Sequence, residues 1–273
     1  MSAIERLLSP RTFHLLGAIL ILAGLALPFP IIVWNTNHTP PILGTRSAED
    51  LLGDLRPRMI VMPVTPPFAL ADTEVTRALY KKVMNKDPSE SECAGDCPVE
   101  NVSWFDAIDF CIALSKLEGL APCYERIDKK VTELNPDRCT GYRLPTEKEW
   151  EVAAYAGTNM RWAGTDDESK LAEYAAFDKT HPEPVRGSRK PNGWFLYDMS
   201  GNVWEWVWDC WSDKANEADC DHVHRGGSFR FDPKWARVSD RVGGSPSSAS
   251  GYYGFRVARS LLHLPPSAHV IGD

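Results

Sequence analysis

The sequence lacks several features that would assign a function class directly. It has no glycine-rich phosphate-binding loop, no Gly-x-Ser-x-Gly nucleophile motif, no internal repeat and no low-complexity segment. It also lacks a basic excess, because 30 Lys and Arg stand against 37 Asp and Glu, for a formal net charge of -7. A general nucleic-acid binder needs a basic surface that displaces counterions from phosphate, so we expect no nucleic-acid partner.

The composition is that of a globular protein rich in turns and aromatic side chains. The 273 residues are 43% hydrophobic and 25% charged, with 10 Trp, 19 Gly and 21 Pro. Many tryptophans, glycines and prolines indicate a loop-rich architecture rather than a helical bundle.

The N-terminal segment 13–34 contains no Asp, Glu, Lys or Arg. About 20 apolar residues suffice to cross a bilayer as a helix, so the segment predicts one transmembrane anchor. Arg6 and Arg11 precede it, and the next basic residue is Arg46. The positive-inside rule then places residues 1–12 in the cytoplasm and the rest in the periplasm or outside the cell, as in a single-pass inner-membrane protein.

Two alternatives for this segment stay open. One is a cleaved signal peptide, for which Gly24-Leu25-Ala26 offers a small-x-small site, and the other is a buried core helix. No cysteine ends the apolar run, so a lipoprotein is not expected. We assign residues 35–57 to a polar, proline-spaced linker, 58–259 to the domain, and 260–273 to a tail.

The seven cysteines favour an exported protein with disulfides. Local pairing is the simplest of the possible connectivities, and it predicts the bridges Cys93–Cys97, Cys123–Cys139 and Cys210–Cys220. Cys111 remains, on the apolar face of a predicted helix, where it is expected to be a buried small hydrophobe. The Cys93-x3-Cys97 spacing has no second Cys or His pair to complete a zinc site.

Capping signals predict three helices. One runs over 77–85, a second opens at Ser103 with Asp106 and closes at Gly119, and a third opens at Thr146 with Glu149 and closes at Gly157. After Gly157 short strands alternate with glycine turns, so the fold class is α+β. His222 and His224 lie two residues apart beside Cys220, on one strand face, as a possible metal pair or as a solvated strand start.

Six stretches, in order, resemble the formylglycine-generating enzyme, or sulfatase-modifying factor, family over residues 58–259. They are Thr73-Glu-Val-Thr76, Pro98-Val-Glu-Asn-Val-Ser-Trp104, Gly141-Tyr-Arg-Leu-Pro-Thr-Glu-Lys-Glu-Trp150, Asn192-Gly-Trp-Phe-Leu-Tyr-Asp-Met-Ser-Gly-Asn-Val-Trp-Glu-Trp206, Arg225-Gly-Gly-Ser228 and Gly254-Phe-Arg256. The resemblance implies a C-type-lectin-like fold with little regular secondary structure. The family's Gly-x-Phe-x-Met-Gly opening hairpin motif is missing between Met62 and Phe68.

The resemblance also implies that copper-dependent chemistry is lost. The enzymes hold copper(I) with two cysteines after the Gly-Gly-Ser strand, and the matching positions here are Phe231 and Ala236. We therefore expect no copper. Trp204 and Ser228 match residues that line the enzymes' oxygen pocket.

A calcium ion is the one cofactor that the resemblance implies for this chain. The matching ligand positions are Asp198, Gly201, Val203 and Glu205, a set of hard oxygen donors. The alternative is that Asp198 and Glu205 cap the turn and pair with Arg256 or a neighbour. The family's second calcium site, which would fall within 172–178, matches poorly and is not expected.

We therefore predict a membrane-anchored, exported binding or accessory module that takes a peptide, protein or small molecule in the family's groove. The first alternative is a periplasmic oxidoreductase of altered chemistry, similar to the relatives that mature chromophores. Its acid–base candidates are Asp232, Asp240 and Glu205. The second alternative is a residual formylglycine-generating oxidase that acts on a sulfatase cysteine.

Overall fold

The computed structural model describes residues 42–43, 51–134, 139–212, 220–261 and 270–271. The chain divides into Met1–Val33 and Trp34–Asp273, and every described residue belongs to the second unit. The predicted membrane segment 13–34 lies outside the described residues. Within the described ranges, no helix is long and apolar enough to span a bilayer.

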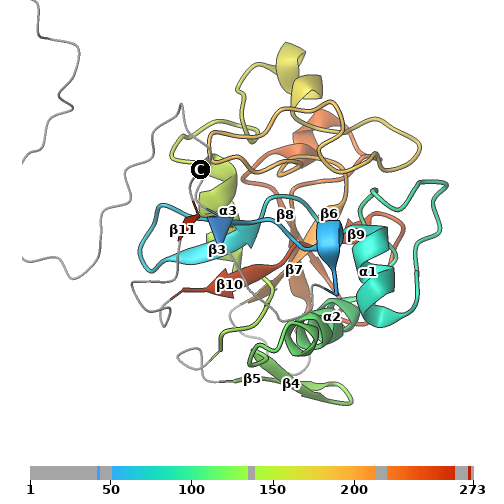
Figure 1. Cartoon of the computed structure of the whole chain (residues 1–273). Helices are drawn as coiled ribbons and strands as arrows, with labels where there is room; N and C mark the ends of the chain where they lie inside the picture. The colour runs from blue at the N-terminus through green and yellow to red at the C-terminus, as the bar shows by residue number, and fades with distance from the viewer. Residues whose placement is uncertain (1–41, 44–50, 135–138, 213–219, 262–269, 272–273) are drawn as a thin grey trace, which may run out of the picture. The chain divides into compact units, whose positions relative to one another are not determined.

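A five-stranded antiparallel sheet joins the two ends of the described chain (Figure 1). Its order is β10-β3-β2-β1-β11, with β10 at Ala258–Ser260, β3 at Phe68–Ala71, β2 at Met59–Val61, β1 at Ile42–Leu43 and β11 at Val270–Ile271. Strand β1 falls in the expected linker and β11 in the expected tail. These parts of both segments are therefore sheet strands.

The opening hairpin forms although its usual sequence motif is missing. Strands β2 and β3 pair in antiparallel register, and the Met62 amide donates to the Phe68 carbonyl at 2.8 Å. Every residue of both strands is buried, including Ile60 and Leu70 at 0% exposure. Burial on both faces thus holds the hairpin although the family's glycine motif is missing.

Three helices occupy the predicted places because their caps are local. α1 spans Arg77–Met84, α2 Trp104–Leu117 and α3 Glu147–Tyr155. Both predicted capping boxes form, Ser103 with Asp106 and Thr146 with Glu149. Helices α1 and α2 pack together beside the second sheet (Figure 1).

The second sheet carries the strands that border the candidate sites. It has the order β8-β7-β6-β9, with β8 at Arg241–Gly244, β7 at His222–Arg225, β6 at Trp204–Cys210 and β9 at Tyr253–Gly254. A separate hairpin pairs β4, Tyr124–Ile127, with β5, Lys130–Glu133. Short 3-10 helices are η1 at Gly53–Leu55, η2 at Glu168–Glu173 and η3 at Pro233–Ala236. The mixed α/β class with few helices agrees with the prediction.

Six of the seven cysteines form disulfides, and the seventh is buried. The structure contains the three bridges that local pairing predicts, Cys93–Cys97, Cys123–Cys139 and Cys210–Cys220. Cys111 is free and fully buried on α2, where burial raises the pKa of its thiol. It is therefore a packing residue and no nucleophile.

Candidate functional site

The turn after β7 fixes the segment that the resemblance matches to the copper cysteines. Gly226 and Gly227 have φ values of 93° and 79°, and a Cβ on Gly227 would lie 2.5 Å from the Trp235 carbonyl oxygen. Only glycine fits this close approach, and it folds 228–236 back on the turn. Phe231 is half-buried and Ala236 is 1% exposed. Neither side chain offers a ligand for copper.

Three aromatic side chains meet at Phe231, the first of the two positions matched to the copper cysteines, whereas Ala236 at the second position packs in a separate buried cluster with Trp162 and Leu171. We call Phe231, Trp235 and Tyr252 the aromatic surface. The Phe231 ring meets the edge of Tyr252 at 5.4 Å between centroids and lies 6.4 Å from Trp235. Trp235 is 41% exposed, and the Lys234 ammonium lies 5.6 Å from its ring centroid. A partly exposed aromatic cluster with charged neighbours suits binding of a chain or ligand more than redox chemistry.

Trp204 and Ser228 are buried and hydrogen-bond to backbone segments next to this surface. They are 3% and 1% exposed. The Trp204 amide donates to the Tyr252 carbonyl at 2.8 Å, and the Arg230 amide donates to the Ser228 hydroxyl at 3.4 Å. Both residues therefore position backbone segments of the aromatic surface.

The predicted acid–base candidates occupy different environments. Asp232 caps η3 through the Lys234 amide at 3.2 Å and pairs with the Lys234 ammonium at 2.9 Å. Asp240 is half-buried, and burial raises the pKa of its carboxyl. Glu205 has no exposed surface. A general acid must reach the reacting atom, so burial removes Glu205 from that role.

Two of the four predicted calcium positions, Asp198 and Glu205, are buried charged residues, and with Glu74 we call them the carboxylate cluster; Gly201 and Val203 are buried neighbours in the chain. Glu205 accepts both prongs of the Arg256 guanidinium, at 2.6 and 2.7 Å, and the Trp150 indole N–H at 2.8 Å. Asp198 accepts from Arg189 at 2.5 Å and from the Arg186 amide at 2.8 Å. The pairing that the alternative interpretation expected is therefore present.

Glu74 is the member of the carboxylate cluster that the sequence analysis did not single out. It is 2% exposed, and within the described part of the chain neither carboxylate oxygen has a hydrogen-bond partner. Burial, with the nearby charge of Asp198, raises its pKa well above the usual range. The motif Thr73-Glu-Val-Thr76 contained this residue, but nothing local in the sequence indicates that it is buried.

The unpartnered oxygens of Glu74 suit a calcium ion, whereas arginines compete with calcium for the carboxylates of Asp198 and Glu205. Arg256 pairs with Glu205, and Arg189 pairs with both Asp198 and Glu183, so neither guanidinium forms an ion pair with Glu74. Unpartnered buried carboxylate oxygens are the hard donors that calcium takes. Glu74 also lines a cavity of about 250 Å³, together with Asp72 and Arg186.

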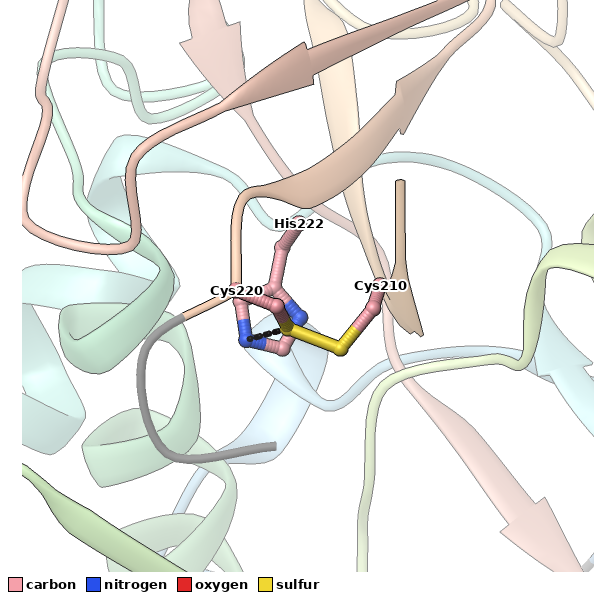
Figure 2. A group of neighbouring side chains, drawn as sticks. All are labelled: Cys210, Cys220 and His222. Carbon is pink, nitrogen blue, oxygen red and sulfur yellow. Dashed lines mark hydrogen bonds between the residues drawn. A yellow bond between two sulfur atoms is a disulfide. The ribbon is translucent and has the colours of Figure 1, made fainter. Parts of the chain in front are cut away.

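The predicted histidine pair is divided between two environments. His224 has 0% exposure, and its ring contacts those of Trp206 and Tyr253 at centroid distances of 3.4 and 4.0 Å. Neither of its ring nitrogens makes a hydrogen bond to a described residue. Burial lowers its pKa to about 3. His222 instead groups with Cys210 and Cys220 (Figure 2). His224 is therefore a core residue.

A family model and several relatives resemble this chain. The model for the sulfatase-modifying factor enzyme 1-like domain matches residues 56–261. The chaperone protein LppX of Paenibacillus barcinonensis is 31% identical over 229 residues, which cover 71% of this chain and 80% of that protein. The formylglycine-generating enzyme of Bos taurus is 29% identical over 62% of this chain and 45% of the enzyme. The inactive C-alpha-formylglycine-generating enzyme 2 of Bos taurus is 33% identical over 62% and 52%. The chain thus spans about half the length of these two bovine proteins.

Solved structures agree in fold. Treponema denticola variable protein 1 superposes with a TM-score of 0.65 at 34% identity, covering 71% of this chain and 85% of that one. PvdO from Pseudomonas aeruginosa gives a TM-score of 0.57 at 28% identity, covering 81% and 90%.

Proposed function

The chain belongs to the sulfatase-modifying factor family, and on that premise we propose that it is a binding or accessory module without copper-dependent oxidase activity. The observation that carries the proposal is that the first matched cysteine position is Phe231, a member of the aromatic surface, and the second is the buried Ala236. Phe231 and Ala236 stand at the matched positions, and Trp235 is exposed beside them. Such a surface binds through apolar area and aromatic edges.

The ligand that we propose for this surface is an extended peptide or an unfolded segment of a protein. Two relatives support a role without oxidation, since one is named a chaperone and another an inactive enzyme. The partly exposed rings supply apolar contacts, and Arg230, Asp232 and Lys234 supply polar contacts around them. The alternative is a periplasmic oxidoreductase of altered chemistry, with Asp240 as its half-buried acid.

We place the protein in the inner membrane as a single-pass chain with its domain in the periplasm or outside. Three disulfides support an oxidising compartment. We also propose that the domain has the family's C-type-lectin-like arrangement. We propose that the carboxylate cluster binds a structural calcium ion. Glu74 supplies donor oxygens, because the carboxylates of Asp198 and Glu205 already accept from arginines.

Two measurements on the purified full-length, disulfide-intact chain test the binding role. In the first, a Cys-x-Pro-x-Arg peptide is incubated with copper(I) and oxygen, and we expect its mass to stay unchanged. In the second, binding to an array of extended peptides is compared for Trp235→Ala and Trp211→Ala. Trp211 is the matched control, because it is 40% exposed and also lies under a cation, that of Arg241.

We expect Trp235→Ala to weaken peptide binding at least about tenfold, since aromatic anchors often carry more than 1.4 kcal/mol of an interface. Trp211→Ala should bind as the wild type does. Oxidation of the peptide, or equal losses in the two variants, would contradict the proposed function.

A further inference from the structure

A soft ligand set lies outside the aromatic surface and the carboxylate cluster. Cys210 ends β6 and is the register partner of His222, which begins β7. Cys220 precedes His222 by two residues and is bonded to Cys210. One ligating atom from each of the three residues lies within 4.8 Å of the others (Figure 2).

The imidazole of His222 is held in the tautomer that a metal ligand needs. Its Nδ1 lies 2.9 Å from the Trp208 carbonyl oxygen, which can only accept, so Nδ1 carries the proton. The lone pair is therefore on Nε2, which faces the Cys220 sulfur. The ring also stacks on Trp104 at 3.7 Å, with an angle of 13° between the planes. Metal-bound histidines commonly donate their second ring nitrogen to a carbonyl in this way.

The spacing of the sulfur and the nitrogen matches a tetrahedral ion. Zinc–sulfur bonds of about 2.3 Å and zinc–nitrogen bonds of about 2.0 to 2.1 Å at a tetrahedral angle put the two ligand atoms about 3.6 Å apart. The observed separation of Cys220 Sγ and His222 Nε2 is 3.7 Å. The imidazole is thus already placed for an ion shared with Cys220, and the Cys210–Cys220 bond must break before both sulfurs can bind it.

An entry route exists. Cys210 and His222 both line a cavity of about 620 Å³, whose wall also includes Trp104, Trp208 and Asp209. An ion held by three protein ligands there has room for water at its fourth position, as in open zinc sites.

We propose that Cys210, Cys220 and His222 form a redox-gated site for zinc(II), closed while the disulfide is intact and opened by a dithiol. In the opening step a thiolate of the dithiol attacks the disulfide, the protein S–S bond breaks, and the dithiol closes to its own disulfide. The protein sulfurs gain two electrons and two protons in this exchange. Zinc binding then releases the thiol protons to solvent, because thiolates are the ligands.

Cobalt(II) titration of the full-length chain tests the proposal. The chain is reduced with a water-soluble phosphine without oxygen, desalted, and titrated while absorption is recorded. We expect thiolate-to-cobalt charge-transfer bands and tetrahedral d–d bands that saturate with a single equivalent and disappear on adding zinc. The oxidised chain should show neither. His222→Ala should weaken cobalt binding at least about tenfold, whereas the double variant Cys93→Ser/Cys97→Ser should keep the bands.

Near-ultraviolet circular dichroism of the reduced chain, with and without zinc, reports the fold in parallel. The proposal expects native spectra in the presence of zinc. The proposal is overturned if the reduced wild type gives no charge-transfer bands, or if His222→Ala binds cobalt as tightly as the wild type does. Loss of the bands in the Cys93/Cys97 variant, or a reduced chain that is non-native with and without zinc, overturns it as well.

Discussion

At the scale of single residues, Glu74 has the least compensated charge in the carboxylate cluster. Asp198 and Glu205 each have a guanidinium partner, whereas neither Glu74 oxygen has a hydrogen-bond partner among the described residues. A buried carboxyl without partners costs stability when ionised, unless a cation binds it. The state of this one side chain therefore reports on the proposed calcium ion.

Glu74→Gln is expected to stabilise the chelator-treated protein at pH 8 by about 1 kcal/mol or more. The folded-state pKa of Glu74 is raised above 4.5, so its stabilising contribution is present below pH 4.5 and is lost as pH rises through the folded-state value. Glutamine cannot ionise and avoids that loss. Urea unfolding at pH 8 and pH 4 measures the difference, and the exposed Glu92→Gln serves as control.

Calcium should reverse the order of stability, so that the wild type becomes more stable than Glu74→Gln. The wild type gains stability when calcium binds the native state only, and Glu74→Gln gains little. A variant that is less stable than the wild type in chelator, or one that keeps the full calcium effect, would remove Glu74 from the proposed site.

At the scale of elements, the turn between β7 and η3 depends on one glycine. Gly227→Ala should destabilise the domain by several times the cost of Gly53→Ala, which is about 1 to 2 kcal/mol. Both glycines have positive φ, 79° at Gly227 and 52° at Gly53. A Cβ added at Gly227 would clash with backbone atoms, whereas a Cβ added at Gly53 would have no atom within 4 Å. Thermal melts of the two variants measure this, and equal melting temperatures would show that the turn is not as close to Trp235 as described.

Strand β7 carries two buried histidines that make the domain acid-sensitive. Burial lowers the pKa of His222 to about 4 and that of His224 to about 3, from 6.5. The unfolded chain therefore binds protons first as pH falls, so stability is full above about pH 6.5 and declines toward pH 3. His224 alone accounts for a loss of about 2 kcal/mol at pH 5.

His224→Leu should remove that share of the decline. Its stability at pH 7.5 should stay within about 1 kcal/mol of wild type, because no ring nitrogen of His224 is hydrogen-bonded within the described chain. Urea unfolding from pH 7.5 to pH 5 checks the slope, with exposed His181→Gln as control. A variant with the wild-type pH slope would contradict the assignment of the acid sensitivity to His224.

The elements also separate what local sequence predicts from what it does not. The caps of α2 and α3 could be identified because both partners lie within four residues of chain. Strand β1 could not, because Ile42 pairs with Ile271 and no local pattern encodes a partner so distant. The same holds for Glu74, whose environment is made by Asp198, Glu205 and Arg256. The pairing of Cys210 with Cys220 was predictable, but the approach of His222 Nε2 to the sulfur came from the β6–β7 register.

At the scale of the whole molecule, the family's architecture is present and its metal-binding thiols are not. The family model matches residues 56–261, and the core, the three helices and the second sheet lie inside that range. At the position matched to the thiols, Phe231 packs against Tyr252. We propose that this chain keeps the fold without the oxidation and that the aromatic surface binds a ligand.

The proposed loss of copper-dependent oxidation is tested most directly by mass spectrometry of a Cys-x-Pro-x-Arg peptide after incubation with the disulfide-intact chain, copper(I) and oxygen. We expect the peptide cysteine to be converted to formylglycine no faster than with copper alone. Conversion of the cysteine to formylglycine that depends on the chain would contradict it, and would show that oxidation proceeds without thiols at positions 231 and 236.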